Sequence, residues 1–131
     1  MVHNIALSIT VPSTTFRNVN YKKVIFYQIV VQYVAINGMM TAWQIFSRYN
    51  DFLELFKVLQ HTCEDLETFE FPPKRVLNGP KSVMERKEKF EEFIRIAVVR
   101  LNPLPTELFL FLELDKHTSL SRTLQSNGNE A

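Results

Sequence analysis

The chain has 131 residues, about the size of one domain, and its 46% hydrophobic residues, including 11 Phe, are enough for one core. Fifteen Lys and Arg residues against 14 Asp and Glu residues leave a net charge of only +1. Overall charge therefore does not favour binding to nucleic acid or non-specific binding to acidic lipid, and any anion must be bound by a local cluster.

The chain contains a single cysteine, Cys63, which excludes an internal disulfide, and no Cys/His spacing typical of a metal site occurs. A cytosolic protein is consistent with this composition. The N-terminus has no basic region followed by an apolar run, so we expect no secretory signal. The longest apolar stretches are too short to span a bilayer, so contact with a membrane would be made from its surface.

The first half of the chain is predicted to form three β-strands. Hydrophobic residues alternate with smaller or polar ones over residues 5–11. Residues 23–36 are rich in Val, Ile, Tyr and Phe, which favour strands. Asn37-Gly38 follows directly and is a strong hairpin signal, because both residues tolerate positive φ. With a third strand over 41–48, the pattern predicts an antiparallel meander.

The second half of the chain is predicted to begin with a helix. Asn50 is a suitable N-cap, and an apolar stripe at helical spacing continues over residues 52–66. Cys63 falls on that stripe, which predicts a core position and not a nucleophile. The Phe-Pro-Pro-Lys sequence then begins an extended loop over residues 71–80.

Two further helices are predicted, a long one over residues 82–101 and a short, mostly apolar one over 105–114. Strands followed by helices indicate the α+β class: a three-stranded antiparallel β-meander packed against a helical subdomain of three to four helices. We expect one domain over residues 1–117 and a disordered polar tail over 118–131.

Arg86 interrupts the apolar pattern of the long helix. It lies between Val83 and Phe90, roughly 40° from the centre of their stripe at about 100° per residue. The side chain should therefore point toward the body of the domain, where an Arg is costly unless an anion or a carboxylate accompanies it. A ligand, an internal ion pair and a side chain that reaches the rim all remain open. The carboxylates considered for an ion pair are Glu67, Glu70 and Glu113.

Two other cations lie where a binding site can form. Arg48 ends an apolar strand just before a helix, where the chain changes direction, and Lys74 lies in the proline-stiffened loop. Each alone is typical of a solvated charge. Together with Arg86 they have the composition of a phosphate site, because Arg offers a rigid fork of donors and Lys a compact point charge.

Three segments resemble the PX (phox-homology) domains of sorting nexins and related trafficking proteins. Residues 48–55, Arg-Tyr-Asn-Asp-Phe-Leu-Glu-Leu, are similar to the family's Arg-Tyr-x-x-Phe segment, and residues 71–74 to its proline-rich loop. Residues 83–93 resemble the Glu-Arg-(Arg/Lys)-x-x-Leu-Glu-x-Phe start of a later helix, with Phe90 where the family usually has Leu. The resemblance covers about residues 4–115, with the three segments in the family's order.

The resemblance implies the PX fold and a basic pocket for phosphatidylinositol 3-phosphate, the commonest ligand of the family. By position, Arg48 would clamp the 3-phosphate and Tyr49 would stack against the inositol ring. Lys74 would meet the 1-phosphate, and Arg86 would bond to the remaining ring hydroxyls. The implied function is membrane targeting in protein sorting, without cofactor or catalysis, in a cytoplasmic protein peripheral to endosomal membranes. Trafficking proteins are possible partners.

The loop before the long helix supplies candidates for membrane contact. Val76 and Leu77, with Met84 as a further candidate, would enter the bilayer, and the alternative for the first two is ordinary packing against the helices. The loop is shorter and less apolar than in many relatives, so we expect modest insertion. Basic residues that would add attraction to an anionic membrane are Arg75, Lys81, Lys87 and Lys89.

The sequence leaves two alternatives to lipid recognition. One is a protein-interaction module that keeps the PX fold and binds lipid weakly or not at all, and a comparison of liposomes separates it from a lipid-binding module. The other is an enzyme, which is not expected, because the sequence has three glycines, no Gly-rich phosphate loop and no Ser/His/Asp or Cys/His arrangement.

Overall fold

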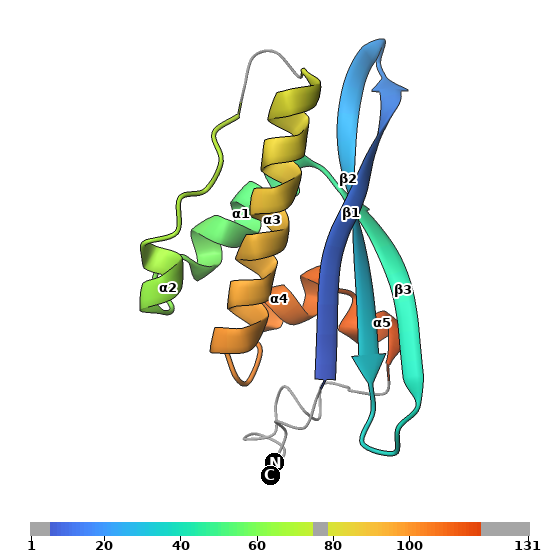
Figure 1. Ribbon diagram of the computed structural model, residues 1–131, viewed down its shortest axis with the longest axis vertical. Coiled ribbons are helices and arrows are strands. Elements are labelled where there is room, and N and C mark those ends of the chain that lie inside the picture. The colour runs from blue at the N-terminus through green and yellow to red at the C-terminus, as the bar shows by residue number, and fades with distance from the viewer. Residues whose placement is uncertain (1–5, 75–78, 119–131) are drawn as a thin grey trace.

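The sheet has three strands, and the helices pack on one of its faces (Figure 1). The computed structural model describes residues 6–74 and 79–118. Within them, the strands run antiparallel in the order β1-β2-β3, as the alternating pattern predicts. The strands are β1 (Ala6–Val19), β2 (Lys22–Val34) and β3 (Met40–Ser47).

The helices follow the sheet along the chain, which confirms the predicted α+β class. The described residues contain five of them, where three to four are expected, and two have only four residues. None of the described helices is long and apolar enough to cross a membrane. Of the predicted polar tail over 118–131, only Thr118 lies within the described residues. The helices are α1 (Tyr49–Leu59), α2 (Glu64–Glu67), α3 (Pro80–Arg100), α4 (Thr106–Phe111) and α5 (Leu114–His117).

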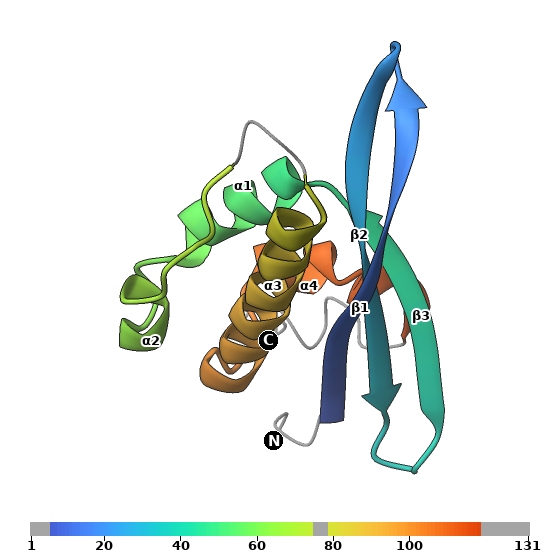
Figure 2. The same cartoon turned by 45° about the horizontal axis from the view of Figure 1, so that its top comes forward.

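The first strand is longer than its alternating pattern predicts. β1 continues through Pro12, where its register against β2 shifts between Thr10 and Ser13. A proline has no N–H to donate and is tolerated at such an irregularity, so the strand bends there without ending. A two-residue turn, Asn20 and Tyr21, with φ of 51° and 65°, joins β1 to β2. The resulting β1–β2 hairpin projects beyond the helices (Figures 1 and 2).

The first helix begins earlier and ends sooner than predicted. Its N-cap is Arg48 and not Asn50, and the Asp51 carboxylate accepts a hydrogen bond of 2.8 Å from the Arg48 backbone N–H. The helix ends at Leu59, whose carbonyl accepts a hydrogen bond from the Thr62 hydroxyl. The stripe expected over 52–66 is therefore divided between α1 and α2, and the half-buried Cys63 is the N-cap of α2.

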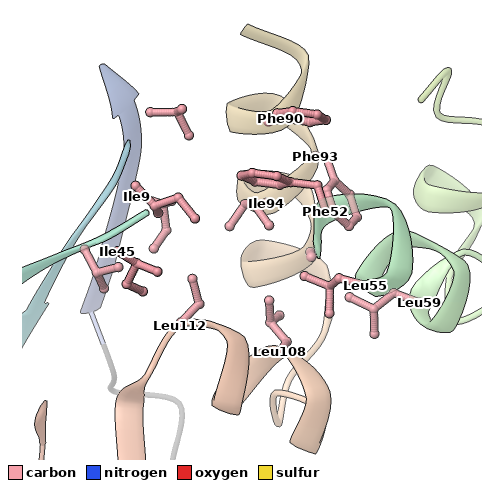
Figure 3. Close-up of a cluster of buried hydrophobic side chains, with 14 of the residues drawn as sticks. Ile9, Ile45, Phe52, Leu55, Leu59, Phe90, Phe93, Ile94, Leu108 and Leu112 are labelled. Carbon is pink, nitrogen blue, oxygen red and sulfur yellow. The ribbon is translucent and has the colours of Figure 1, made fainter. Parts of the chain in front are cut away.

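The core lies between the inner face of the sheet and helices α1, α3 and α4 (Figure 3). Ile9 and Ile45 project from the sheet, and Leu108 and Leu112 close the core from the α4 end. The Trp43 indole N–H donates a hydrogen bond of 2.9 Å to the Leu112 carbonyl, which attaches the chain after α4 to β3. Figure 3 also shows the main contributors from α1 and α3, which are Phe52, Leu55, Leu59, Phe90, Phe93 and Ile94.

Side chains of α3 cover the outer edge of β1. The N–H of Val11 donates to the Glu91 carboxylate at 2.7 Å, and the Val11 carbonyl accepts from the Lys87 ammonium at 3.2 Å. Arg95 donates to the Ile9 carbonyl at 2.9 Å. An edge strand otherwise presents unpaired backbone groups, so these bonds both satisfy the edge and attach the long helix to the sheet.

Replacing Glu91 by Ala is expected to lower the free energy of unfolding by about 1–3 kcal/mol, because the buried Val11 N–H loses its acceptor. The matched control is Glu92→Ala, which removes only an exposed pair with Lys89 and should change stability by less than about 0.5 kcal/mol. Chemical denaturation measures both. Equal effects of the two substitutions would show that the β1 edge does not depend on Glu91.

Candidate functional site

Four residues singled out from the sequence surround one hollow of about 150 Å³ between the sheet and the helices. Of the residues suggested for membrane contact, Lys81 is exposed in the first turn of α3 and does not line this hollow. Arg75, Val76 and Leu77 lie outside the described residues. The residues brought together are Arg48, Tyr49, Lys74 and Arg86.

Arg48 stands at the junction between β3 and α1. Its backbone is held by Asp51, so the position of the side chain follows from the start of the helix. The guanidinium lies 6.0 Å from the centre of the Phe26 ring on β2, and the side chain is exposed. Arg48 therefore stands exposed at the rim of the hollow, with its guanidinium near an aromatic ring.

Tyr49 ties the proline-rich segment to α1. Its hydroxyl donates a hydrogen bond of 2.6 Å to the Pro72 carbonyl, and its ring lies 5.8 Å from the Phe71 ring. The Lys74 ammonium and the Arg86 guanidinium each lie 5.9 Å from the centre of the Tyr49 ring. A ring held in this way can position two cations at once, because both are attracted to its π-electrons.

Arg86 points into the body of the domain, as its place on the helix predicts, and only 3% of its surface is exposed. None of the three carboxylates considered for an internal ion pair is its partner. Glu67 pairs with His61, and Glu113 pairs with Lys116 and His117. Glu70 forms no ion pair within the described residues. The buried positive charge is therefore not balanced by any of these carboxylates.

Two further residues of the hollow, Tyr27 and Lys23 on β2, do not stand out in the sequence. Tyr27 is 1% exposed, and its hydroxyl lies close to the Arg86 guanidinium, but within the described residues it makes no hydrogen bond of regular geometry. The signal in the sequence is weak, because Tyr27 shares its strand face with the aliphatic Ile29 and Val31 and with a second buried tyrosine, Tyr33. A buried hydroxyl without a regular hydrogen bond is costly, which makes it a candidate for a ligand contact.

The charge of Arg86 also acts on the two tyrosines. Burial raises the pKa of Tyr27 above its ordinary value, and the neighbouring positive charge of Arg86 opposes part of that rise. Burial raises the pKa of Tyr49 as well, again against the effect of Arg86. Both hydroxyls therefore stay protonated at neutral pH. They remain neutral hydrogen-bond donors and leave the positive charge of the site intact.

The lining of the hollow contains cations and no carboxylate. A larger hollow between α2 and α3 carries charges of both signs, and some of them pair across it, as Arg100 does with Asp65 and Lys89 with Glu92. No group of His, Cys, Asp and Glu among the described residues is arranged to hold a metal ion. The cations of the 150 Å³ hollow are Lys23, Arg48, Lys74 and Arg86, so the ligand it suits is an anion.

The chain is similar to PX domains both in sequence and in structure. The family model described as PX domain matches residues 37–115. The human kinesin-like protein KIF16B is 31% identical over 91 residues, which cover 65% of this chain and 7% of that protein. Its mouse counterpart is 33% identical over 64 residues, covering 47% of this chain and 5% of that protein. The matched stretch is thus a small part of these relatives.

Solved structures share the fold. A designed CISK-PX domain matches with a TM-score of 0.63 and 24% identity, over 81% of this chain and 98% of that one. The mouse SNX19 PX domain, in a crystal structure with a bound sulphate ion, matches with a TM-score of 0.61 and 19% identity, over 84% and 98% of the two chains. At these identities the likeness shows the fold alone.

Replacing Tyr27 by Phe is expected to leave the free energy of unfolding equal or raise it by up to about 2 kcal/mol, because it keeps the ring and removes a buried hydroxyl that makes no hydrogen bond of regular geometry within the described residues. The retained ring preserves the edge-on contacts with Phe52 and Phe90. Thermal and chemical unfolding measure the effect, with Tyr33→Phe as the control. A clear loss of stability in Tyr27→Phe would show that the hydroxyl is satisfied in the folded protein.

Proposed function

The chain belongs to the PX domain family, and from this premise we propose that it binds phosphatidylinositol 3-phosphate on endosomal membranes in protein sorting. PX domains are generally non-catalytic modules that bind phosphoinositides and target proteins to membranes. Because the matched stretch is a small part of the curated relatives, the proposal concerns this module and not the activity of a larger protein.

The observation that carries the proposal is the convergence of Arg48, Lys74 and Arg86 on one hollow whose lining contains no carboxylate. In the proposed complex, Arg48 at the rim clamps the 3-phosphate through its fork of donors. Lys74, held beside the Tyr49 ring, meets the 1-phosphate. Arg86 bonds to the remaining ring hydroxyls, and Tyr49 packs against the inositol ring. Charged hydrogen bonds of this kind are the strong ones, and their fixed geometry selects the lipid.

Two further points support an anionic head group. The mouse SNX19 PX domain carries a bound sulphate ion in one crystal structure, a tetrahedral anion with the same shape as phosphate. The burial of Arg86 also favours a ligand that enters the hollow over one that touches the surface, because only an entering group can reach a side chain that is 3% exposed. The proposed selectivity therefore depends on the inner cation, and the rim cations add attraction.

The segment after Lys74 is proposed to contact the bilayer. Arg75, Val76 and Leu77 directly follow Lys74 in the sequence, and Lys81 lies exposed in the first turn of α3. The two cations add attraction to anionic lipid of about 1 kcal/mol each when near the surface. Val76 and Leu77 add apolar insertion. Binding of the head group in the hollow brings this segment to the membrane, because Lys74, which lines the hollow, directly precedes the segment in the sequence.

Liposome binding tests the proposal. The domain should bind liposomes that contain phosphatidylinositol 3-phosphate and bind plain phosphatidylcholine liposomes poorly, because the hollow supplies cations for a phosphorylated head group. Liposomes with other phosphoinositides, at matched total charge, test selectivity in a sedimentation assay. Equal binding to every anionic liposome would reject head-group selectivity, and no binding to any of them would favour a protein-interaction module with the PX fold.

Substitutions in the hollow test the assigned residues. Arg48→Gln should weaken binding to phosphatidylinositol 3-phosphate liposomes by about 10-fold or more, the loss expected for a charged hydrogen bond of about 1.5–3 kcal/mol. Arg86→Lys keeps the charge but loses the fork, and a similar loss is expected. The control Lys57→Gln removes one exposed charge from α1, outside the hollow, and should bind nearly normally. Unchanged binding in both hollow variants, with unchanged melting temperatures, contradicts the assignment.

A further inference from the structure

Tyr27 and Arg86 are the two most deeply buried polar side chains in the lining of the 150 Å³ hollow. Only 1% and 3% of their surfaces are exposed, whereas Arg48 and Lys74 of the same lining are exposed. The Tyr27 hydroxyl lies close to the Arg86 guanidinium. A head group that enters the hollow therefore meets the exposed cations first and this buried pair last.

The ring of Tyr27 is fixed by its neighbours. Phe52 of α1 and Phe90 of α3 meet it edge-on, with ring centres 6.0 and 4.9 Å away, and these two rings stack on each other at 4.0 Å. A close-packed interior leaves a ring enclosed in this way no room for a second rotamer. The Tyr27 hydroxyl is therefore held beside Arg86 and cannot turn out to solvent.

The fold makes little use of the Tyr27 hydroxyl. The oxygen is buried, yet within the described residues it makes no hydrogen bond of regular geometry. A buried polar group in that state lowers stability, and proteins keep such groups mainly where they serve a function. Phenylalanine would make the same ring contacts with Phe52 and Phe90 without this cost. The hydroxyl is thus better explained by the site than by the core.

Arg86 needs an orienting group that leaves its charge intact. Its guanidinium lies 5.9 Å from the centre of the Tyr49 ring, but attraction to a ring does not fix the direction of each N–H donor. A carboxylate would fix the donors and would also cancel charge that an anionic ligand needs, and the lining of the hollow contains none. The Tyr27 oxygen can accept a hydrogen bond without adding charge, because burial raises the pKa of the hydroxyl and keeps it protonated.

We propose that Tyr27 is a positioning residue for Arg86 in the lipid-bound domain. Its oxygen accepts a hydrogen bond from one guanidinium N–H, and the other donors of the fork then face the ring hydroxyls of the inositol. The head group completes this alignment, because its oxygens hold the opposite side of the guanidinium. The inference rests on the proposed function and adds to it a residue of β2, which lies outside the family match over residues 37–115. A hydroxyl that lowers the stability of the free domain thereby raises its affinity.

Calorimetry with soluble inositol 1,3-bisphosphate tests this role. Tyr27→Phe should weaken binding by about 3- to 10-fold, the factor that corresponds to one hydrogen bond, while the melting temperature stays equal or rises. The control Tyr33→Phe changes a second buried tyrosine of the same strand face, which does not line the hollow, and should bind as the wild type does. Unchanged binding of Tyr27→Phe overturns the proposal. Weaker binding together with a lower melting temperature overturns it as well, because the hydroxyl then serves the fold.

A double-mutant cycle shows whether Tyr27 acts through Arg86. Arg86→Lys removes the fork of donors, so adding Tyr27→Phe to that variant should cost no further affinity for inositol 1,3-bisphosphate. The matched control cycle uses Arg48→Gln at the exposed rim of the hollow, where the two losses should multiply. Losses that multiply in both cycles would mean that the hydroxyl acts without Arg86, and the proposal would be wrong.

Analogues of the head group locate the effect on the ligand. Each analogue is inositol 1,3-bisphosphate without one ring hydroxyl. The wild type and Tyr27→Phe should bind about equally to the analogue that lacks the hydroxyl bonded by Arg86, because the aligned donor then has no acceptor. The other analogues should keep the difference of about 3- to 10-fold. The same difference with every analogue contradicts an alignment of Arg86.

The outcomes separate this proposal from the proposed function. A wild type that does not bind inositol 1,3-bisphosphate rejects the proposed function, and the role of Tyr27 with it, before any variant is measured. A wild type that binds, with a Tyr27→Phe variant that binds equally well, rejects the positioning role alone and leaves the proposed function in place.

Discussion

The burial of Phe90 connects the elements that build the candidate site. Its ring stacks on Phe52 of α1 at 4.0 Å and meets Tyr27 of β2 edge-on at 4.9 Å. It also lies 5.6 Å from the ring of Phe71, on the proline-rich segment. Arg86 is about one helical turn earlier on the same face of α3, so the position of Phe90 determines where the guanidinium enters the hollow. A contact made entirely of aromatic rings thus positions a charge.

The long helix α3 serves the fold and the site through different side chains. Phe90 packs into the core, Lys87, Glu91 and Arg95 bond to the edge of β1, and Arg86 lines the 150 Å³ hollow. A helix distributes successive residues around its axis, so one element can do all of this without conflict. The same bonds that protect a strand edge also hold the β1–β2 hairpin beside the helix.

The positive and negative side chains are unevenly distributed along the chain, and the net charge does not show this. The first 50 residues contain four Lys and Arg residues and no Asp or Glu, so all 14 carboxylates lie in the helical half of the sequence. Several of those carboxylates are neutralised locally, as Asp65 is by Arg100. Although the net charge is only +1, the sheet carries positive side chains alone, and the helical layer beside it carries side chains of both signs. Near an anionic membrane such an arrangement orients the domain as well as attracting it.

The sequence by itself determined the α+β class, the order of the elements, the Asn37-Gly38 turn and the inward direction of Arg86, because side-chain periodicity and turn chemistry are local properties. The tertiary structure decided what each buried face meets. It carried β1 through Pro12 and brought the Tyr27 hydroxyl to Arg86. These features depend on contacts between segments far apart in the chain, and periodicity tells which face of an element is buried but not which residues bury it.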